Sequence, residues 1–293
     1  MSFSTVHSRQ TAIKITIKVA IAVGAIFVLT ITLLPYLWLV ITSFKNYGEV
    51  FDVPPTLIPK APTLDVYKGV FTGEQLGRHD PWPLFFANSL TVAGGAALLC
   101  TLIASFAGYG FARFTNLKGG TFLLILILVS QMFPGPSLLI PIYAMLRRLT
   151  LDNSRLGLLL LYTAFVLPFT TWMSVGTFRN IPQDLEDAAR IDGCSRLQAF
   201  LRIVLPMSKL GMATTALFAF LLSWSEYPFG LVLLKTQSKH TVAVGLGAFL
   251  REFDVFWNEM AAATVMMSLP LVIIFLFVQK FFVRGLTEGA LSG

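Results

Sequence analysis

Long stretches without a charged side chain alternate along the chain with short polar segments. Asp, Glu, Lys and Arg are absent from residues 19–44, 81–112, 119–146, 156–178, 210–225 and 260–279. A helix needs about 20 apolar residues to cross roughly 30 Å of hydrocarbon. The fifth run continues as apolar sequence past Glu226 to Leu234. The pattern therefore predicts six transmembrane helices, at about 19–44, 84–112, 119–146, 156–178, 208–234 and 260–282.

The composition also favours a membrane protein. Of the 293 residues, 55% are hydrophobic and only 13% are charged, whereas soluble globular chains carry about 25% charged residues. A disordered chain would be rich in charge and poor in aromatic residues, and this one contains 26 Phe. Buried core helices of this length normally carry a polar stripe. We therefore expect an all-α membrane protein rather than a soluble enzyme.

Six crossings place both termini on one side of the membrane. The first apolar run is too long for the core of a signal peptide, so we expect residues 1–18 to remain on the chain. Lys and Arg are slightly more frequent on the side of the termini, which indicates a cytoplasmic N-terminus at 1–18 and a cytoplasmic tail at 285–293. Arg147, Arg148 and Arg155 fall on the opposite side and weaken this interpretation.

Motifs for catalysis by the chain itself are absent from the sequence. There is no G-x-x-x-x-G-K-[ST] phosphate loop and no H-E-x-x-H zinc motif. The three histidines are far apart, and Cys100 and Cys194 form no metal-ligand pattern. We therefore expect no enzyme activity, no metal and no cofactor in this chain.

The segment between the fourth and fifth spans, residues 179–209, has the pattern of two short helices joined by a turn. Pro182 suits the first turn of a helix, and Gly193 is a typical left-handed end. Ser195 can cap a second helix, which carries apolar residues every three to four positions: Leu197, Phe200, Leu201 and Val204. A solvated connector would not need such a stripe, which indicates a partner surface. A DNA-binding helix-turn-helix looks similar, but attachment to the bilayer at both ends excludes nucleic acid as a partner.

The same segment resembles the EAA loop of permeases from binding-protein-dependent ABC importers. The stretch Glu186-Asp-Ala-Ala-Arg-Ile-Asp-Gly193 is followed, nine residues later, by Ile203-Val-Leu-Pro206. This spacing matches the family's motif, with Asp187 as the one departure. Further similarity lies in Tyr109-Gly-Phe-Ala-Arg113 and Trp224-Ser-Glu-Tyr-Pro228. The whole chain is similar to the shorter, six-span permease subunit of maltose-type sugar importers, and we call residues 179–209 the coupling loop.

The resemblance implies a set of partners. In that family the loop docks on a homodimeric ATPase, which binds ATP and Mg²⁺, and the chain pairs with a second, longer permease. A periplasmic or extracellular sugar-binding protein delivers the substrate, and lipid surrounds the spans. By resemblance, Glu186 pairs with a basic group of the ATPase, and Leu197 and Phe200 are apolar anchors. The docking set implied by the motif is Glu186, Ala188, Ala189, Asp192, Gly193, Leu197, Phe200 and Pro206.

Residues of the translocation path are harder to identify. Polar residues inside the predicted spans are candidates, chiefly Asn88, Gln131, Ser225 and Glu226. A charge at mid-membrane costs roughly 2.5–3.5 kcal/mol, so Glu226 is either a helix-end residue bonded to a neighbour or faces a wet cavity. Prolines interrupt the third span (Pro134, Pro136, Pro141) and the fifth (Pro228). In the outer loop, the candidates for contact with the binding protein are Arg251, Phe256 and Trp257, although anchoring at the membrane interface is the more frequent role of aromatic residues at such a boundary.

The sequence thus predicts an inner-membrane permease subunit that moves a sugar or oligosaccharide into the cytoplasm, powered by ATP hydrolysis in a partner. The alternative is an ion-coupled secondary transporter, which usually buries several carboxylates along its path, whereas Glu226 is the single candidate here. A membrane receptor or assembly factor without transport is a further alternative. Whether the sugar is neutral or acidic stays open.

Overall fold

The computed structural model describes residues 3–72, 74–75, 78–79, 81–114, 119–249 and 255–291, and the side chains before residue 16 and after residue 279 lie outside that description. Five long helices dominate it: α1 (Phe3–Ser43), α3 (Trp82–Arg113), α6 (Arg155–Arg179), α10 (Lys209–Ser225) and α13 (Trp257–Leu291). The shorter helices are α2 (Asp65–Thr72), α4 (Gly120–Val129), α5 (Leu139–Arg148), α7 (Asp184–Ile191), α8 (Arg196–Ala199), α9 (Leu205–Met207), α11 (Pro228–Leu233) and α12 (Val242–Gly247). A two-residue hairpin pairs β1 (Glu74–Gln75) with β2 (Arg78–His79).

The predicted all-α membrane fold is confirmed, but two of the six spans are broken. Four helical stretches are long and apolar enough to cross a bilayer unaided: Thr16–Ser43, Trp82–Arg113, Arg155–Arg179 and Trp257–Gln279. In the third predicted span, Gly120–Met132 and Gly135–Arg148 meet at 86°, on either side of Pro134. In the fifth, α10 ends at Ser225 and α11 begins at Pro228, because proline has no N–H to continue the helix and restricts the residue before it.

The coupling loop is also bent against the span that follows it. Its second half, Arg196–Met207, meets Lys209–Ser225 at 77°. The first and last helices are longer than the spans predicted within them. Helix α1 begins before residue 19, and α13 continues past residue 282, so that the predicted tail at 285–293 starts inside a helix.

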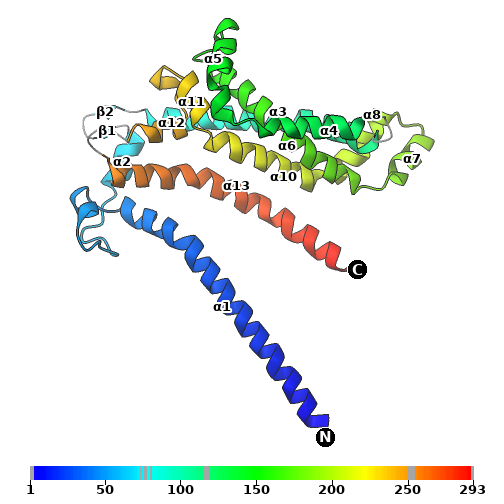
Figure 1. Ribbon diagram of the computed structural model, residues 1–293, viewed down its shortest axis with the longest axis horizontal. Helices are drawn as coiled ribbons and strands as arrows, with labels where there is room; N and C mark the ends of the chain where they lie inside the picture. The colour runs from blue at the N-terminus through cyan, green and yellow to red at the C-terminus, as the bar shows by residue number, and fades with distance from the viewer. Residues whose placement is uncertain are drawn as a thin grey trace.

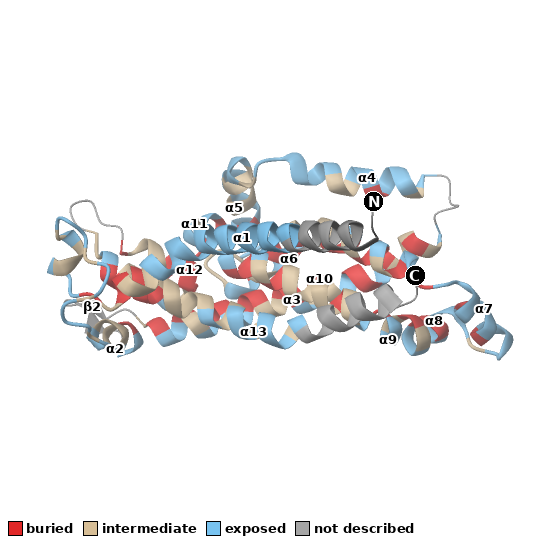
Figure 2. Cartoon of the chain, turned by 90° about the horizontal axis from the view of Figure 1, so that it is seen from below, coloured by how far each residue is buried: buried red, intermediate tan, exposed pale blue. Residues whose placement is uncertain are grey.

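The core of the molecule is formed by α3, α6 and α10, which pack along most of their length (Figures 1 and 2). Small residues allow this close approach, as is common between transmembrane helices. A Cβ atom on Gly108 of α3 would lie 2.5 Å from the Cβ of Ser174 in α6. A Cβ atom on Gly211 of α10 would lie 2.2 Å from the side chain of Thr177. The helix spacing therefore depends on glycine at these two positions.

Helix α1 stands apart from this core. The C-terminal end of α1 contacts α13, and α1 diverges from the bundle toward its own N-terminus (Figure 1). The hydroxyl groups of Tyr36 and Ser268 form a hydrogen bond of 2.5 Å in the region of contact. The most apolar window of Thr16–Ser43 has no buried residue. Lipid or another protein chain therefore has access to most of the surface of α1 between Thr16 and Leu37.

The two ends of the bundle differ in structure. One end carries α7 and α8, and the N-terminal part of α1 and the C-terminal part of α13 extend toward the same end (Figure 1). The other end carries α2, the hairpin and residues 45–63. We call residues 45–63 the outer segment. Within it, the carboxylate of Glu49 accepts hydrogen bonds from the backbone N–H of Lys60 (2.9 Å) and the hydroxyl of Thr56 (2.8 Å). The Lys60 N–H is the main cause that lowers the pKa of Glu49 below 4.5, its usual value.

Candidate functional site: the coupling loop

The first half of the coupling loop is a helix with a glycine-dependent end. Helix α7 carries Asp184, Glu186 and Asp187 in its first turn, where negative charge interacts favourably with the helix dipole. Gly193 follows the helix with a φ of 91°, in the left-handed region that favours glycine. Gly193 thus ends α7 and begins the turn to the next segment.

The second half begins with a complete capping box. The hydroxyl of Ser195 accepts a bond from the backbone N–H of Gln198 (3.3 Å), and the Gln198 side chain accepts one from the Ser195 N–H (2.8 Å). Helix α8 then continues as a π-helix over Phe200–Val204 and as α9. These bonds fix the direction in which α8 leaves the turn.

The apolar stripe of this half does not form a single exposed face. Phe200 and Val204 are buried against Ala112, Phe178 and Met212. The ring centroids of Phe200 and Tyr109 are 4.5 Å apart. In contrast, Leu197 is 57% exposed, and Leu201 is exposed as well. Phe200 is therefore a core residue of this chain, which corrects its prediction as a docking anchor, whereas Leu197 is available to a partner.

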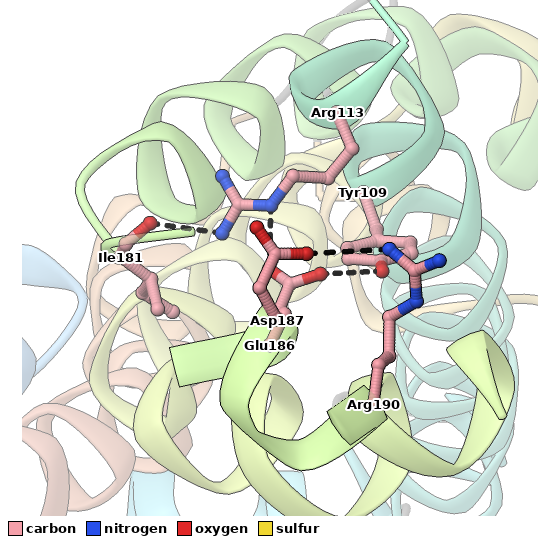
Figure 3. A network of polar contacts seen from close by, with 6 residues as sticks. All are labelled: Tyr109, Arg113, Ile181, Glu186, Asp187 and Arg190. Atoms are coloured by element: carbon pink, nitrogen blue, oxygen red, sulfur yellow. Dashed lines mark hydrogen bonds and ion pairs between the residues drawn. The ribbon is translucent and has the colours of Figure 1, made fainter. Parts of the chain in front are cut away.

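A buried ion pair joins α7 to the end of α3 (Figure 3). Arg113 Nε lies 2.5 Å from Glu186 Oε1, and both side chains are less than a tenth exposed. The hydroxyl of Tyr109 donates a hydrogen bond to Glu186 Oε2 (2.7 Å), and Arg113 Nη2 donates one to the carbonyl of Ile181 (2.8 Å). We call these four residues the Glu186 network. It connects α7, which we call the coupling helix, to α3 of the core.

The Glu186 network engages Glu186 within its own chain, and the expected pairing of Glu186 with a basic group of another subunit stays a prediction. Its carboxylate is occupied by two groups of its own chain, and a buried charge of this kind must be paired to be tolerated. Asp187 is the neighbouring acidic residue that points outward, with a side chain 64% exposed. Ala189 is buried as well, whereas Ala188, Asp192, Gly193 and Pro206 are exposed.

The exposed part of the loop forms a surface at the end of the molecule. It consists of the predicted residues Ala188, Asp192, Gly193, Leu197 and Pro206, together with Ile191, which is 87% exposed. We call this set the docking face. Exposed apolar residues flanked by charged ones are typical of protein interfaces.

The residues predicted to line a translocation path make bonds within the chain. Asn88 is fully buried, and its amide binds the carbonyls of Ser238 and His240 and the guanidinium of Arg155. A side chain with its amide engaged in this way joins outer-end segments and has no surface for a substrate, which differs from its prediction. Gln131 is exposed and donates to the carbonyl of Phe165 (2.7 Å).

The other two path residues lie at the break between α10 and α11. Ser225 is exposed and bonds back to the carbonyl of Leu221. The carboxylate of Glu226 accepts bonds from the Tyr162 hydroxyl (2.5 Å) and from the backbone N–H groups of Phe229 (2.8 Å) and Gly230 (3.2 Å). Of the two roles open for Glu226, the structure therefore favours the helix-end residue.

The outer-loop residues are only partly described. Arg251 lies outside the described residues. Phe256 is half-buried, with its ring centroid 5.6 Å from that of Tyr47. Trp257 is 44% exposed and lines a pocket with Trp38 and other residues of the outer end. Their contact with a binding protein remains a prediction.

Two residues of the Glu186 network were absent from the predicted docking set. Tyr109 and Arg113 stand four positions apart at the end of an apolar run, and this spacing places both on one helix face. Their pairing with Glu186 depends on the tertiary contact between α3 and α7, which periodicity does not reveal. In the described part of the chain, no group of three His, Cys, Asp or Glu could hold a metal ion.

Comparison with protein families gives a match over most of the chain. The profile of the family described as "Binding-protein-dependent transport system inner membrane component" matches residues 100–288. The chain is 36% identical over 271 residues to the sulfoquinovosyl glycerol transport system permease protein SmoH of Agrobacterium fabrum, covering 92% of this chain and 93% of that protein. It is 32% identical over 277 residues to the trehalose/maltose transport system permease protein MalG of Thermococcus litoralis, covering 94% and 97%.

The fold is also similar to that of a solved structure. A chain of a bacterial ABC transporter involved in the import of the acidic polysaccharide alginate superposes with a TM-score of 0.73 at 22% identity. The match covers 92% of this chain and 97% of that chain. At this level of identity the similarity concerns the fold alone.

Proposed function

Because this chain belongs to the family of binding-protein-dependent transport system inner membrane components, we propose that it carries a sugar or short oligosaccharide into the cytoplasm as one permease subunit of an ABC importer. The chain itself binds no nucleotide. ATP and Mg²⁺ are bound by a separate ATPase, two copies of which act on the permease pair. A second, longer permease completes the membrane channel, and an external binding protein delivers the sugar.

One observation carries this proposal: the coupling loop presents an exposed docking face while the buried Glu186 network fixes it to the bundle. A displacement of the docking face is therefore passed to α3 through Arg113 and Tyr109 rather than absorbed in the loop. ATP binding changes the shape of the ATPase pair, and only a stiff connection makes that change useful at the membrane. The loop combines the two features that such a connection requires: an exposed docking face and a buried attachment to α3.

The direction of insertion follows from the same assignment. The docking face must meet an ATPase in the cytoplasm, so α7, the N-terminal part of α1 and the C-terminal part of α13 lie on the cytoplasmic side. These three elements extend toward one end of the molecule (Figure 1). The outer segment then faces the binding protein. The named sugars of the relatives, from trehalose and maltose to sulfoquinovosyl glycerol, support a carbohydrate substrate, either neutral or acidic.

Reconstitution tests the proposal. The chain is inserted into proteoliposomes with its second permease, and the ATPase, the binding protein and radiolabelled maltose or sulfoquinovosyl glycerol are added. We expect uptake of one of these sugars that requires both ATP and the binding protein. An ATPase variant that binds but does not hydrolyse ATP should abolish this uptake.

The same assay separates the alternative mechanism. Uptake that persists with the inactive ATPase, and that follows an imposed proton or sodium gradient, would establish an ion-coupled transporter and refute the proposal. The bonds of Glu226 argue against this alternative, because its carboxylate is already shared by one hydroxyl and two backbone N–H groups.

A further inference from the structure

A polar cleft lies between the end of α3 and the coupling helix α7. It encloses about 180 Å³ and is lined by Arg113, Arg190, Arg196, Phe114, Glu186 and Asp187, among others. Tyr109, Arg113 and Glu186 of the Glu186 network line it. We propose that this cleft receives an acidic side chain of the ATPase subunit, with Arg196 as the ion-pair partner. The proposal rests on the proposed function and identifies the chemistry of one docking contact.

Arg196 is the cation of the cleft for which the described residues provide no ion-pair partner. Arg113 is bonded to Glu186, and Arg190 lies 3.2 Å from Asp187. Among the described residues, no carboxylate forms an ion pair with Arg196, whose guanidinium carbon lies 5.3 Å from the centre of the Phe114 ring. Contact with an aromatic ring holds a guanidinium in place while its N–H groups remain available to an acceptor.

The position of Arg196 is not explained by the stability of its own helix. It is the first residue of α8, directly after the Ser195 cap. A positive charge at the N-terminus of a helix interacts unfavourably with the helix dipole. A carboxylate bound beside the guanidinium would neutralise this charge. The charge at Arg196 is therefore better accounted for by a partner than by local structure.

The charge balance of the cleft favours a single anionic group, and the adjacent surface favours one from a protein. Three arginines face two acidic residues, so that one positive charge is uncompensated. A single Asp or Glu side chain neutralises this charge and accepts two parallel bonds from a guanidinium. A lipid phosphodiester carries the same single charge, so the neighbouring surface decides between the two. The adjacent docking face contains exposed Ile191 and Leu197, which suit a protein surface.

Charge reversal at Arg196 tests the proposal. The permease pair is held in nanodiscs of phosphatidylcholine with phosphatidylglycerol, and binding of the purified ATPase is measured by biolayer interferometry. We expect Arg196→Glu to raise the Kd at least tenfold. Arg202→Glu is the matched control, because Arg202 is an exposed arginine of the same loop outside the cleft; its Kd should change less than threefold. Arg196→Lys should give an intermediate Kd, because lysine keeps the charge without the paired N–H geometry.

A second experiment identifies the partner group. Each exposed Asp and Glu of the ATPase near its permease-binding surface is changed to Arg, and one of these variants should restore binding to Arg196→Glu. Equal Kd values for Arg196→Glu and Arg202→Glu would overturn the proposal. An effect of Arg196→Glu that disappears in nanodiscs of phosphatidylcholine alone would also overturn it, because the acceptor would then be the anionic phosphatidylglycerol.

The outcome is distinguishable from a failure of the proposed function. If the unchanged permease pair binds no ATPase and moves no sugar, both proposals are refuted. If the unchanged pair binds the ATPase and transports sugar, but Arg196→Glu does so equally well, only the assignment of the cleft is refuted.

Discussion

Removal of the Arg113 side chain tests the connection between the coupling loop and the membrane helices. In Arg113→Met the carboxylate of Glu186 stays in a buried site with Tyr109 as its remaining side-chain donor. Breaking a buried ion pair by removing one partner costs about 3–5 kcal/mol. The charge regains water only if α7 leaves the bundle. We therefore expect the equilibrium for local detachment of α7 to shift by a factor of roughly 100 to several thousand.

Thiol labelling measures this shift directly. Ala189 faces the bundle and is 7% exposed, so a cysteine at this position reacts only when α7 detaches. In an Ala189→Cys, Cys194→Ser background, Arg113→Met should speed maleimide labelling by about two to three orders of magnitude. It should also lower ATP-driven uptake more than it lowers ATP hydrolysis, because the motion of the ATPase is no longer passed to α3.

Two controls make the result specific. Arg179→Met removes an exposed arginine from the end of α6 and should leave the labelling rate within about twofold. Tyr109→Phe removes one hydrogen bond to a charged group, which is worth about 1.5–3 kcal/mol, and should give a smaller increase than Arg113→Met. If Arg113→Met labels at the parent rate and transports normally, the Glu186 network does not hold α7, and this reasoning is refuted.

Three further predictions concern topology, packing and pH. Cys194 should resist a membrane-impermeant maleimide in intact cells and react in inverted vesicles; fast labelling of intact cells would reverse the proposed orientation. Gly108→Val should destabilise the chain by about 1–3 kcal/mol, because the new side chain overlaps Ser174, whereas Gly110→Val, with open space around it, should keep the melting temperature closer to that of the parent. Because the pKa of Glu49 is lowered in the folded chain, its contribution to the outer segment is complete at neutral pH and is lost as the pH falls below 4.5. Proteolysis of that segment should therefore increase in acid, and Glu49→Gln should remove this dependence; equal acid sensitivity in both proteins would contradict the assignment.

Much of the fold follows from the sequence, because a helix that crosses the bilayer needs about 20 apolar residues. Long apolar runs located the helices that cross the membrane, and Gly193 and Ser195 located the turn of the coupling loop, since these features depend on neighbouring residues alone. The prolines indicated where the third and fifth spans are interrupted. They did not indicate the 86° bend, which depends on how both halves pack against other helices.

The parts that could not be predicted depend on which face of a helix packs against the rest of the chain. Phe200 and Leu197 are three positions apart and equally apolar, yet one is buried and the other exposed. The difference arises because Phe178 and Tyr109, from two other helices, surround Phe200. The pair between Glu186 and Arg113 could not be predicted for the same reason: Arg113 is distant in sequence, and only the packing of α3 against the loop brings the two together.

The bonds of Glu226 limit how the fifth span can move. If α10 and α11 joined into one continuous helix, the N–H groups of Phe229 and Gly230 would bond to carbonyls of that helix. The carboxylate of Glu226 would then lose these two donors within an apolar segment. Such a group at membrane depth costs several kcal/mol. We therefore expect the bend between α10 and α11 to be kept and to move as a rigid unit. The conformational change that opens and closes a pathway then takes place elsewhere in the protein.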